Sequence, residues 1–140
     1  ARGLPRENLV EVRFKPGQAQ MSEAEFRRVR AEVDARAPAT TQAYALAWTL
    51  PFRVECMSVT SAFAFGFDRA LCADGCKPTR PSPLYRAKTR EPYTDLGIRP
   101  AMLLAARDLP QARALVDRGV AADREPPSGS AYLMSTSDKN

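Results

Sequence analysis

One long apolar stretch constrains the fold of this chain more than any other feature. Residues 42–54, QAYALAWTLPFRV, are mostly apolar and do not alternate with polar residues. A strand that helices cover on both faces has this composition, and such strands belong to parallel sheets. The stretch therefore predicts a buried strand of a parallel sheet, and Pro51 is expected to end it.

A second strand is predicted near the start of the chain, at residues 9–14. Its sequence, LVEVRF, alternates in polarity, and one face carries the charged residues Glu11 and Arg13. The apolar face consists of Val10, Val12 and Phe14. This alternation is typical of a strand with one side against the core and the other exposed to water.

A helix is predicted between these two strands. Ser22 and Glu25 have the spacing of a capping box, which marks a helix start. Three apolar residues then fall on one helical stripe, namely Phe26, Val29 and Val33. The first part of the chain is therefore predicted to run strand, helix, buried strand, which is an α/β unit.

The second half of the chain is less regular. Residues 56–67 are apolar and small, which is consistent with a short helix or a packed loop. The proline-rich segment 72–93 lacks periodicity, and connections of this length are usually functional or locked in place. Two helices are then expected, one over residues 101–109 with Pro100 near its first turn and one from Pro110.

The helix that starts at Pro110 has a short apolar stripe and a predicted end. The stripe consists of Ala112, Leu115 and Val116, and Gly119 is expected just past the last turn. Residues 131–138, AYLMSTSD, then predict a further buried strand.

This order of elements predicts an α/β fold. We expect a partial three-layer arrangement, with a sheet of mostly parallel strands, flanking helices and the loop 72–93 within one domain of residues 1–140. The chain begins with what resembles the tail of a helix and stops just after a predicted strand. We therefore expect this domain to be incomplete at both ends.

The composition excludes several kinds of chemistry within these 140 residues. The chain contains no histidine, which excludes a Ser-His-Asp triad, a Cys-His dyad and a histidine-ligated zinc site. Dinucleotide, P-loop, nucleophile-elbow and EF-hand motifs do not occur, and no apolar run approaches the roughly 20 residues of a spanning helix. We therefore predict no catalytic residue, no metal and no cofactor, and the sequence leans away from an enzyme.

Polar residues after two predicted strands form one candidate site for a ligand or a hard cation. Thr49 lies near the end of the buried strand, and the last strand ends with Ser135, Thr136, Ser137 and Asp138. If the sheet is parallel, these side chains meet at one edge, where α/β proteins bind ligands. The alternative is that the sequence STSD caps a following helix.

Basic residues in the proline-rich loop form a second candidate site, which would bind anions. They are Lys77, Arg80, Arg86, Lys88 and Arg90, with tyrosines nearby. A basic loop with aromatic residues can bind nucleic acid or an anionic glycan. The alternative, which the loose spacing and the lack of an RNA- or DNA-binding signature favour, is an exposed loop kept soluble or one docked on an acidic protein surface.

Several ordered blocks of the sequence resemble one bacterial protein family. The blocks are RGLPRENLVEV, SEAEFRRV, YALAWTLPFRV, SVTSAFAFGFD, GIRPAMLLAA, VDRGVAAD and AYLMSTSD. This family occurs in genomes that also encode exosortase, a membrane protein-sorting transpeptidase, and it has no established activity. The resemblance covers nearly the whole chain and implies an exported, periplasmic or secreted α/β protein with further strands and helices on both sides. The early pattern also resembles, at fold level only, caspase-like peptidases of the gingipain type.

The three cysteines are compatible with several roles. Cys72 and Cys76, in CADGC, are not spaced as a thioredoxin-type redox pair, and a zinc site would need Cys56 and a carboxylate as well. A disulfide between Cys72 and Cys76 is feasible because Asp74-Gly75 permits a chain reversal. The export that the resemblance implies favours this disulfide, which leaves Cys56 as a buried thiol or, less favourably, a nucleophile.

The leading hypothesis for function is a non-catalytic exported protein that acts in binding or assembly at the cell envelope. It would be an accessory subunit whose partners are other proteins rather than nucleic acid. One alternative is part of a caspase-like hydrolase whose histidine and cysteine lie outside this chain. A second alternative is a module that binds anions or nucleic acid through the basic loop.

Overall fold

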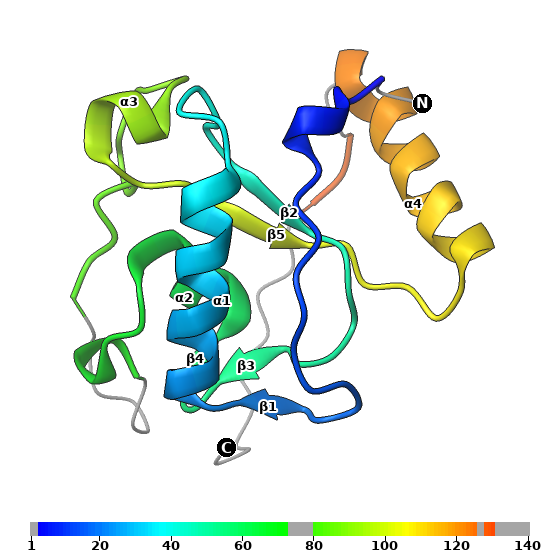
Figure 1. The fold of residues 1–140 in the computed structure, drawn as a ribbon. Coiled ribbons are helices and arrows are strands. Elements are labelled where there is room, and N and C mark those ends of the chain that lie inside the picture. Colours follow the sequence, from blue (N-terminus) through cyan, green and yellow to red (C-terminus); the bar gives the residue numbers. More distant parts are fainter. Residues whose placement is uncertain (1–2, 73–79, 126–127, 131–140) are drawn as a thin grey trace.

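The structure is a computed structural model that describes residues 3–72, 80–125 and 128–130. Helices and short strands are mixed, as predicted for an α/β protein (Figure 1). The strands form two small sheets, one with the order β1-β3-β4 and one with the order β2-β5. Both sheets contain a parallel pair, and the β3–β4 pair is antiparallel.

The predicted first helix is confirmed as α1, Glu23–Arg36. The Ser22 hydroxyl accepts a hydrogen bond from the backbone N–H of Glu25, at 3.2 Å, which satisfies one of the free donors at the helix start. The predicted apolar stripe of Phe26, Val29 and Val33 is buried. These side chains form one wall of the core.

The long apolar stretch forms two short strands rather than one. β2 spans Tyr44–Leu46 and β3 spans Arg53–Val54, and the chain turns between them through a cis peptide bond ahead of Pro51. Each strand joins a different sheet: β3 pairs in parallel with β1, Gln20–Met21, and antiparallel with β4, Met57–Ser58. The predicted parallel pairing is confirmed, but the single continuous strand is wrong.

The residues after Pro100 form a strand and not the predicted helix. β5, Ala101–Leu103, pairs in parallel with β2, with Tyr44 opposite Ala101. The backbone N–H of Tyr44 donates to Pro100 O at 2.8 Å and continues this ladder. The pairing with β2 stabilises the extended conformation of a run that is too short to show a helical period.

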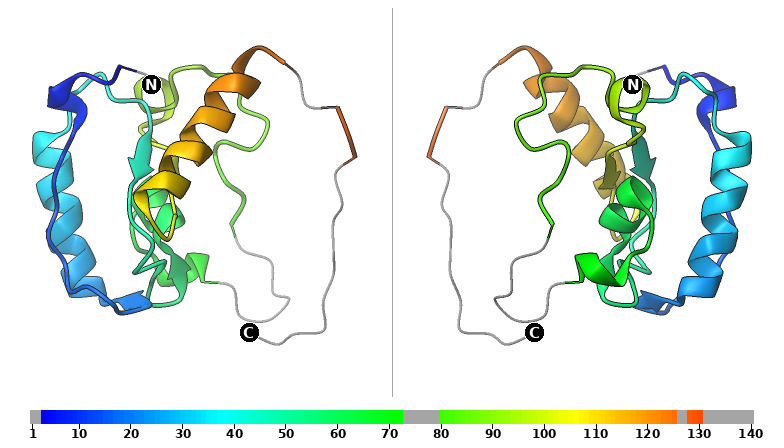
Figure 2. Two further views of the ribbon diagram at one scale, coloured as in Figure 1. Left: turned by 90° about the vertical axis from the view of Figure 1, so that its right-hand side faces the viewer. Right: turned by 90° about the vertical axis from the view of Figure 1, so that its left-hand side faces the viewer.

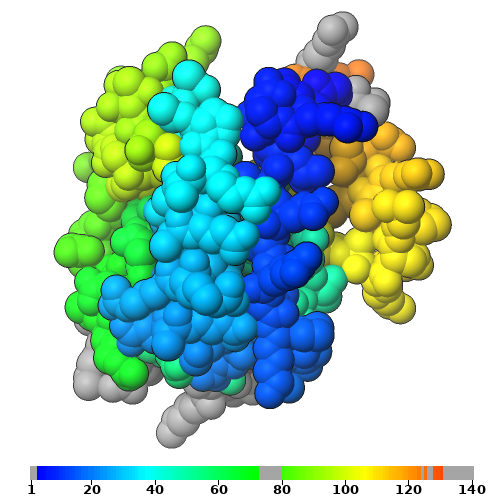
Figure 3. All heavy atoms as spheres, in the orientation of Figure 1, coloured from blue at the N-terminus to red at the C-terminus, as the bar shows by residue number. Residues whose placement is uncertain are grey.

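Residues 9–14 have the predicted burial pattern but are not part of a sheet. The side chains of Val10, Val12 and Phe14 pack against the core, while Glu11 and Arg13 are exposed. No described strand is hydrogen-bonded to this segment, which runs alongside α1 (Figures 1 and 3). The predicted side-chain alternation is therefore right and the predicted strand pairing is wrong.

The centre of the core is the helix α2, Val59–Phe65, which confirms the helical alternative for residues 56–67. Phe63 is fully buried and makes edge-to-face contacts with Phe26, Tyr44 and Trp48. Such aromatic pairs add specificity to the burial of apolar area. The Phe63 ring on α2 therefore joins α1, the strand β2 and the loop that follows β2.

The remaining helices are α3, Pro92–Leu96, and α4, Leu109–Ala121. α4 confirms the predicted helix around Pro110, but it continues through Gly119, which was expected to lie beyond its end. Short 3-10 turns occur at Arg6–Asn8, Arg69–Leu71 and Ala122–Arg124. Figures 1 and 2 show α1 against the body of the protein and α4 to one side, past the carboxyl end of β5.

Candidate functional site

The disulfide of this protein joins Cys56 and Cys72, with 5.4 Å between the Cα atoms. The predicted bond between Cys72 and Cys76 is therefore wrong, and so is the prediction that Cys56 is a free thiol. The physical reason is that α2 and the turn Arg69–Leu71 bring the chain back to its starting point, so that residues 16 apart become neighbours. Cys76 lies outside the described residues.

The disulfide borders an open pocket of about 440 Å³ at the base of the proline-rich loop. The other residues that line it are Met57, Ser58, Ser61, Phe65, Leu71, Arg80, Pro81, Ser82 and Pro83. The hydroxyl groups of Ser58 and Ser61 are already engaged with one another, because Ser58 Oγ caps α2 through Ser61 N–H and also donates to Ser61 Oγ at 2.8 Å. One side of the pocket is therefore the hydrogen-bonded start of α2, and the other side is mainly apolar.

The basic loop does not gather its cations into one patch in the described part. Arg80 lies 3.8 Å from Asp68, and the Arg86 guanidinium stacks on the ring of Tyr85. Lys88 and Arg90 are exposed, and Lys77 lies outside the described residues. Exposed pairs of this kind contribute little to stability and leave the cations available to solvent.

The predicted ligand site at the strand ends rests on one described residue. The Thr49 hydroxyl donates to the backbone carbonyl of Ala106 at 3.0 Å, so it joins the segment after β2 to the segment after β5. Ser135, Thr136, Ser137 and Asp138 lie outside the described residues, as does the whole predicted strand 131–138. The expected convergence of these groups stays a prediction.

A buried arginine, which no sequence pattern marks, forms a polar cluster that joins several of the described elements. Arg99 is only 6% exposed, and it lies directly ahead of β5. Its Nε donates to Thr41 O at 2.8 Å, its Nη1 donates to Tyr44 Oη at 3.2 Å, and its guanidinium stacks on the ring of Tyr93. A buried charge is tolerated only when it is neutralised and hydrogen-bonded, and these partners meet that condition.

Asp34 supplies the negative charge of this cluster from α1. Its carboxylate lies 3.7 Å from Arg99 Nη1 and accepts hydrogen bonds from Tyr44 Oη and, at 2.7 Å, from Arg30 Nε. Arg30 also donates to the carbonyls of Ala62 and Phe63 near the end of α2. The cluster therefore connects α1, α2, β2 and the entry to β5 in one network.

The pKa of the Tyr44 hydroxyl, in this cluster, is raised. Burial raises the pKa of its hydroxyl, and the hydrogen bond to the Asp34 carboxylate raises that pKa further. Both effects disfavour the phenolate, the first by desolvation and the second by negative charge. Tyr44 is therefore held as a neutral donor, which suits a structural role better than that of a general base.

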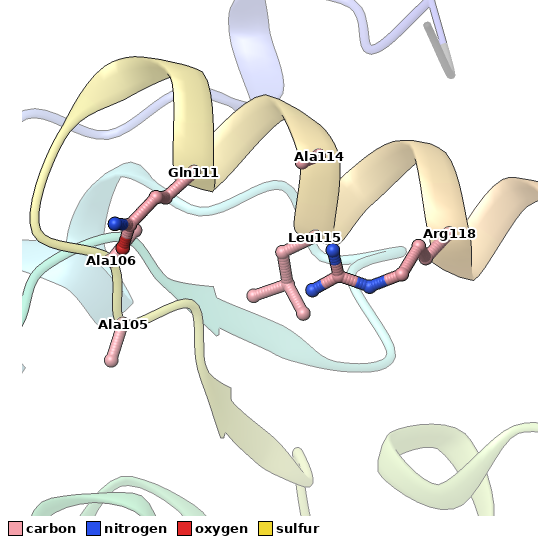
Figure 4. Close-up of a pocket in the computed structure, with 6 residues that line it drawn as sticks. All are labelled: Ala105, Ala106, Gln111, Ala114, Leu115 and Arg118. Atoms are coloured by element: carbon pink, nitrogen blue, oxygen red, sulfur yellow. The ribbon is translucent and has the colours of Figure 1, made fainter.

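The helix α4 has an apolar face that is incompletely covered. Leu109, Ala112, Val116 and Val120 lie on one side of the helix, at helical spacing. None of its residues is buried; Leu109 is 63% exposed and Val120 is 39% exposed. A pocket of about 330 Å³ separates the adjoining Leu115 and Arg118 from Ala105 and Ala106 (Figure 4).

The described residues contain no group of three or more histidine, cysteine or carboxylate side chains placed to hold a metal ion. In that same part of the chain, no helix is both long and apolar enough to span a membrane.

Comparisons with protein-family models, with curated proteins and with solved structures found no match to this chain.

Proposed function

We propose that this chain is part of an exported protein and acts as a non-catalytic binding or assembly module whose partners are other proteins at the cell envelope. The observation that carries the proposal is the apolar face of α4. An amphipathic helix normally buries its apolar stripe, whereas here Leu109 and Val120 at its two ends stay exposed. Between them, Ala112 and Val116 are half-buried, so the whole stripe is only partly covered. Exposed apolar surface of this kind occurs at sites where proteins associate.

The disulfide supports an exported location. Disulfides persist in the periplasm and outside the cell, and they are rare where glutathione and thioredoxin keep thiols reduced. The Cys56–Cys72 bond ties the start of the proline-rich loop to the core beside α2. The resemblance to the exosortase-associated family leads to the same compartment.

The proposal is tested by crosslinking from the α4 face. A photoreactive residue at Val120 is expected to capture a discrete protein of the native cell envelope, whereas the same residue at Ala31, which is exposed on α1, is expected to capture none. The adduct should disappear when Leu109 is changed to Lys, because burial of that side chain contributes about 1.5–3 kcal/mol. The purified chain should show no peptidase activity.

Two results would contradict the proposal. One is equal capture from Val120 and Ala31, which would mean that the α4 face has no preferred partner. The other is peptide hydrolysis that copurifies with the chain and is lost when one of its own polar residues is changed.

A further inference from the structure

Residues 9–14 form an extended segment at the surface of the protein. Its side chains alternate between core and solvent as in a strand, and Phe14 is anchored by an edge-to-face contact with Trp48, at 5.1 Å between ring centroids. Within the described part of the chain it pairs with no strand. A segment with the shape of a strand and no strand beside it has two edges of backbone donors and acceptors that need partners.

Side chains of α1 hydrogen-bond to one of these two edges. Arg36 Nη1 donates to Glu11 O at 2.8 Å, and Arg28 Nη2 donates to Arg13 O at 2.7 Å. The backbone N–H of Lys15 donates to a carboxylate oxygen of Glu25 at 2.9 Å. The backbone groups of the odd-numbered residues 11, 13 and 15 therefore face α1.

The other edge is open. In an extended chain the backbone groups of successive residues point to opposite sides, so those of Val10, Val12 and Phe14 point away from α1. These groups have no hydrogen-bond partner among the described residues. Figure 3 shows the segment at the surface beside α1, and no described strand is hydrogen-bonded to it. An unpaired edge of this kind is a template for another strand.

We infer that this edge pairs with the same edge of a second copy of the chain, as two antiparallel strands related by a two-fold axis at Val12. In this register Val12 faces Val12 of the second copy, and Val10 faces Phe14 of the second copy. Each even-numbered residue then exchanges two backbone hydrogen bonds with the residue opposite it, as in the hydrogen-bonded pairs of an antiparallel ladder.

Charge complementarity selects a second copy as the occupant. In the same register Glu11 faces Arg13 of the second copy, and Arg13 faces Glu11 of the second copy. Opposite charges directly across an antiparallel pair are stabilising, and the two-fold axis creates this pair twice. The side chains of Glu11 and Arg13 are exposed, because the contacts to α1 use only their backbone carbonyls.

The small area of such a contact limits the affinity of the dimer. A single pair of short strands buries far less than the roughly 1,200–2,000 Å² of a stable interface, although the exposed Leu9 extends the apolar contact. The dimer is therefore weak and forms as concentration rises. It uses a different surface from α4, so its failure would leave the proposed function unaffected.

Charge reversal across the pair is the test, read by sedimentation velocity over a range of concentrations. Glu11→Lys places Lys opposite Arg13, and Arg13→Glu places Glu opposite Glu11, so each single change is expected to raise the dimer dissociation constant about tenfold. The double variant Glu11→Arg/Arg13→Glu restores opposite charges and should restore the dimer. Asp117→Lys and Arg113→Glu, on α4, are the matched controls and should leave it unchanged.

Amide hydrogen exchange of the unaltered protein gives a second readout that needs no variant. The amides of Val10, Val12 and Phe14 are expected to gain protection as protein concentration rises, while that of Lys15, already bonded to Glu25, should not change. A chain that stays monomeric at every concentration would overturn the inference. A dimer that neither single charge reversal weakens, or protection that arises only with a different protein, would overturn it as well.

Discussion

Arg99 Nη1 lies 3.7 Å from the Asp34 carboxylate, and this ion pair joins the entry of β5 to the C-terminal half of α1. Arg99 is buried, whereas the Asp34 side chain is 41% exposed. The two charges are therefore in unequal environments: the cation depends on its protein partners, and the anion is partly solvated. This asymmetry determines which member of the pair matters more for stability.

Arg99→Met is expected to lower the free energy of unfolding by about 2 kcal/mol. The substitution removes the cation, so the Thr41 carbonyl loses the bond from Arg99 Nε and Tyr44 Oη keeps only its bond to Asp34. The loss should be below the range for a fully buried pair because water screens Asp34. Urea unfolding measures it.

Arg53→Met is the control for this prediction, since Arg53 is exposed on β3. Its effect should stay within about 0.5 kcal/mol. Equal losses for the two variants would show that the Arg99 cluster contributes nothing beyond an ordinary surface arginine.

The raised pKa of Tyr44 predicts a loss of stability at high pH. Below the ordinary tyrosine pKa of about 10 the group is protonated in both states and its contribution does not change. Above that value the unfolded chain loses this proton before the folded chain does, so the folded state is destabilised as pH rises. Tyr44→Phe should flatten this part of the stability curve, which is measured as unfolding free energy between pH 8 and about 11.

Comparison with Tyr85→Phe isolates the effect, because Tyr85 is exposed. That variant should keep the pH dependence of the unaltered protein. If Tyr44→Phe and Tyr85→Phe give the same curve, the decline at high pH does not come from Tyr44.

The disulfide predicts one free thiol among three cysteines, at Cys76. Alkylation of the denatured protein should add one group before reduction and three after it. Peptide mapping should recover Cys56 linked to Cys72. A linked peptide of Cys72 and Cys76 would contradict the structure.

Removal of that disulfide should cost stability. A closed loop of 16 residues restricts the unfolded chain enough to contribute about 3 kcal/mol, so Cys56→Ser and Cys72→Ser should each lose most of that amount. Cys76→Ser should lose little. Thermal unfolding under oxidising and reducing conditions measures the difference, and loss of the difference on reduction confirms its origin.

Ser22→Ala should destabilise the protein by about 1 kcal/mol, because it removes the hydroxyl that accepts from Glu25 N–H at the start of α1. Ser130→Ala, at an exposed position, is the control. Denaturant unfolding of both variants checks the prediction. A Ser22 variant as stable as the Ser130 variant would show that the cap does not matter here.

Local patterns in the sequence predicted those features that depend on neighbouring residues. The cap at Ser22 and the stripe of Phe26, Val29 and Val33 were enough to place α1 and its buried face, because both follow from the helical period. The alternation in residues 9–14 likewise gave the correct inward and outward side chains. It did not give the partner of that segment, since the period of 2 says which side is buried and nothing about what lies alongside.

Tertiary structure decided the features that depend on distant residues. The run after Pro100 reads as helix by itself, and β5 exists because β2 offers it a hydrogen-bonded edge. Cys72 pairs with Cys56 because α2 returns the chain, whereas three cysteines in sequence allow three pairings. Arg99 carries no sequence signal at all, and its burial follows from Asp34, Tyr44 and Tyr93 converging from separate elements. The physical reason is that secondary structure follows a short period along the chain, while pairing, disulfides and buried charges depend on which segments the fold brings together.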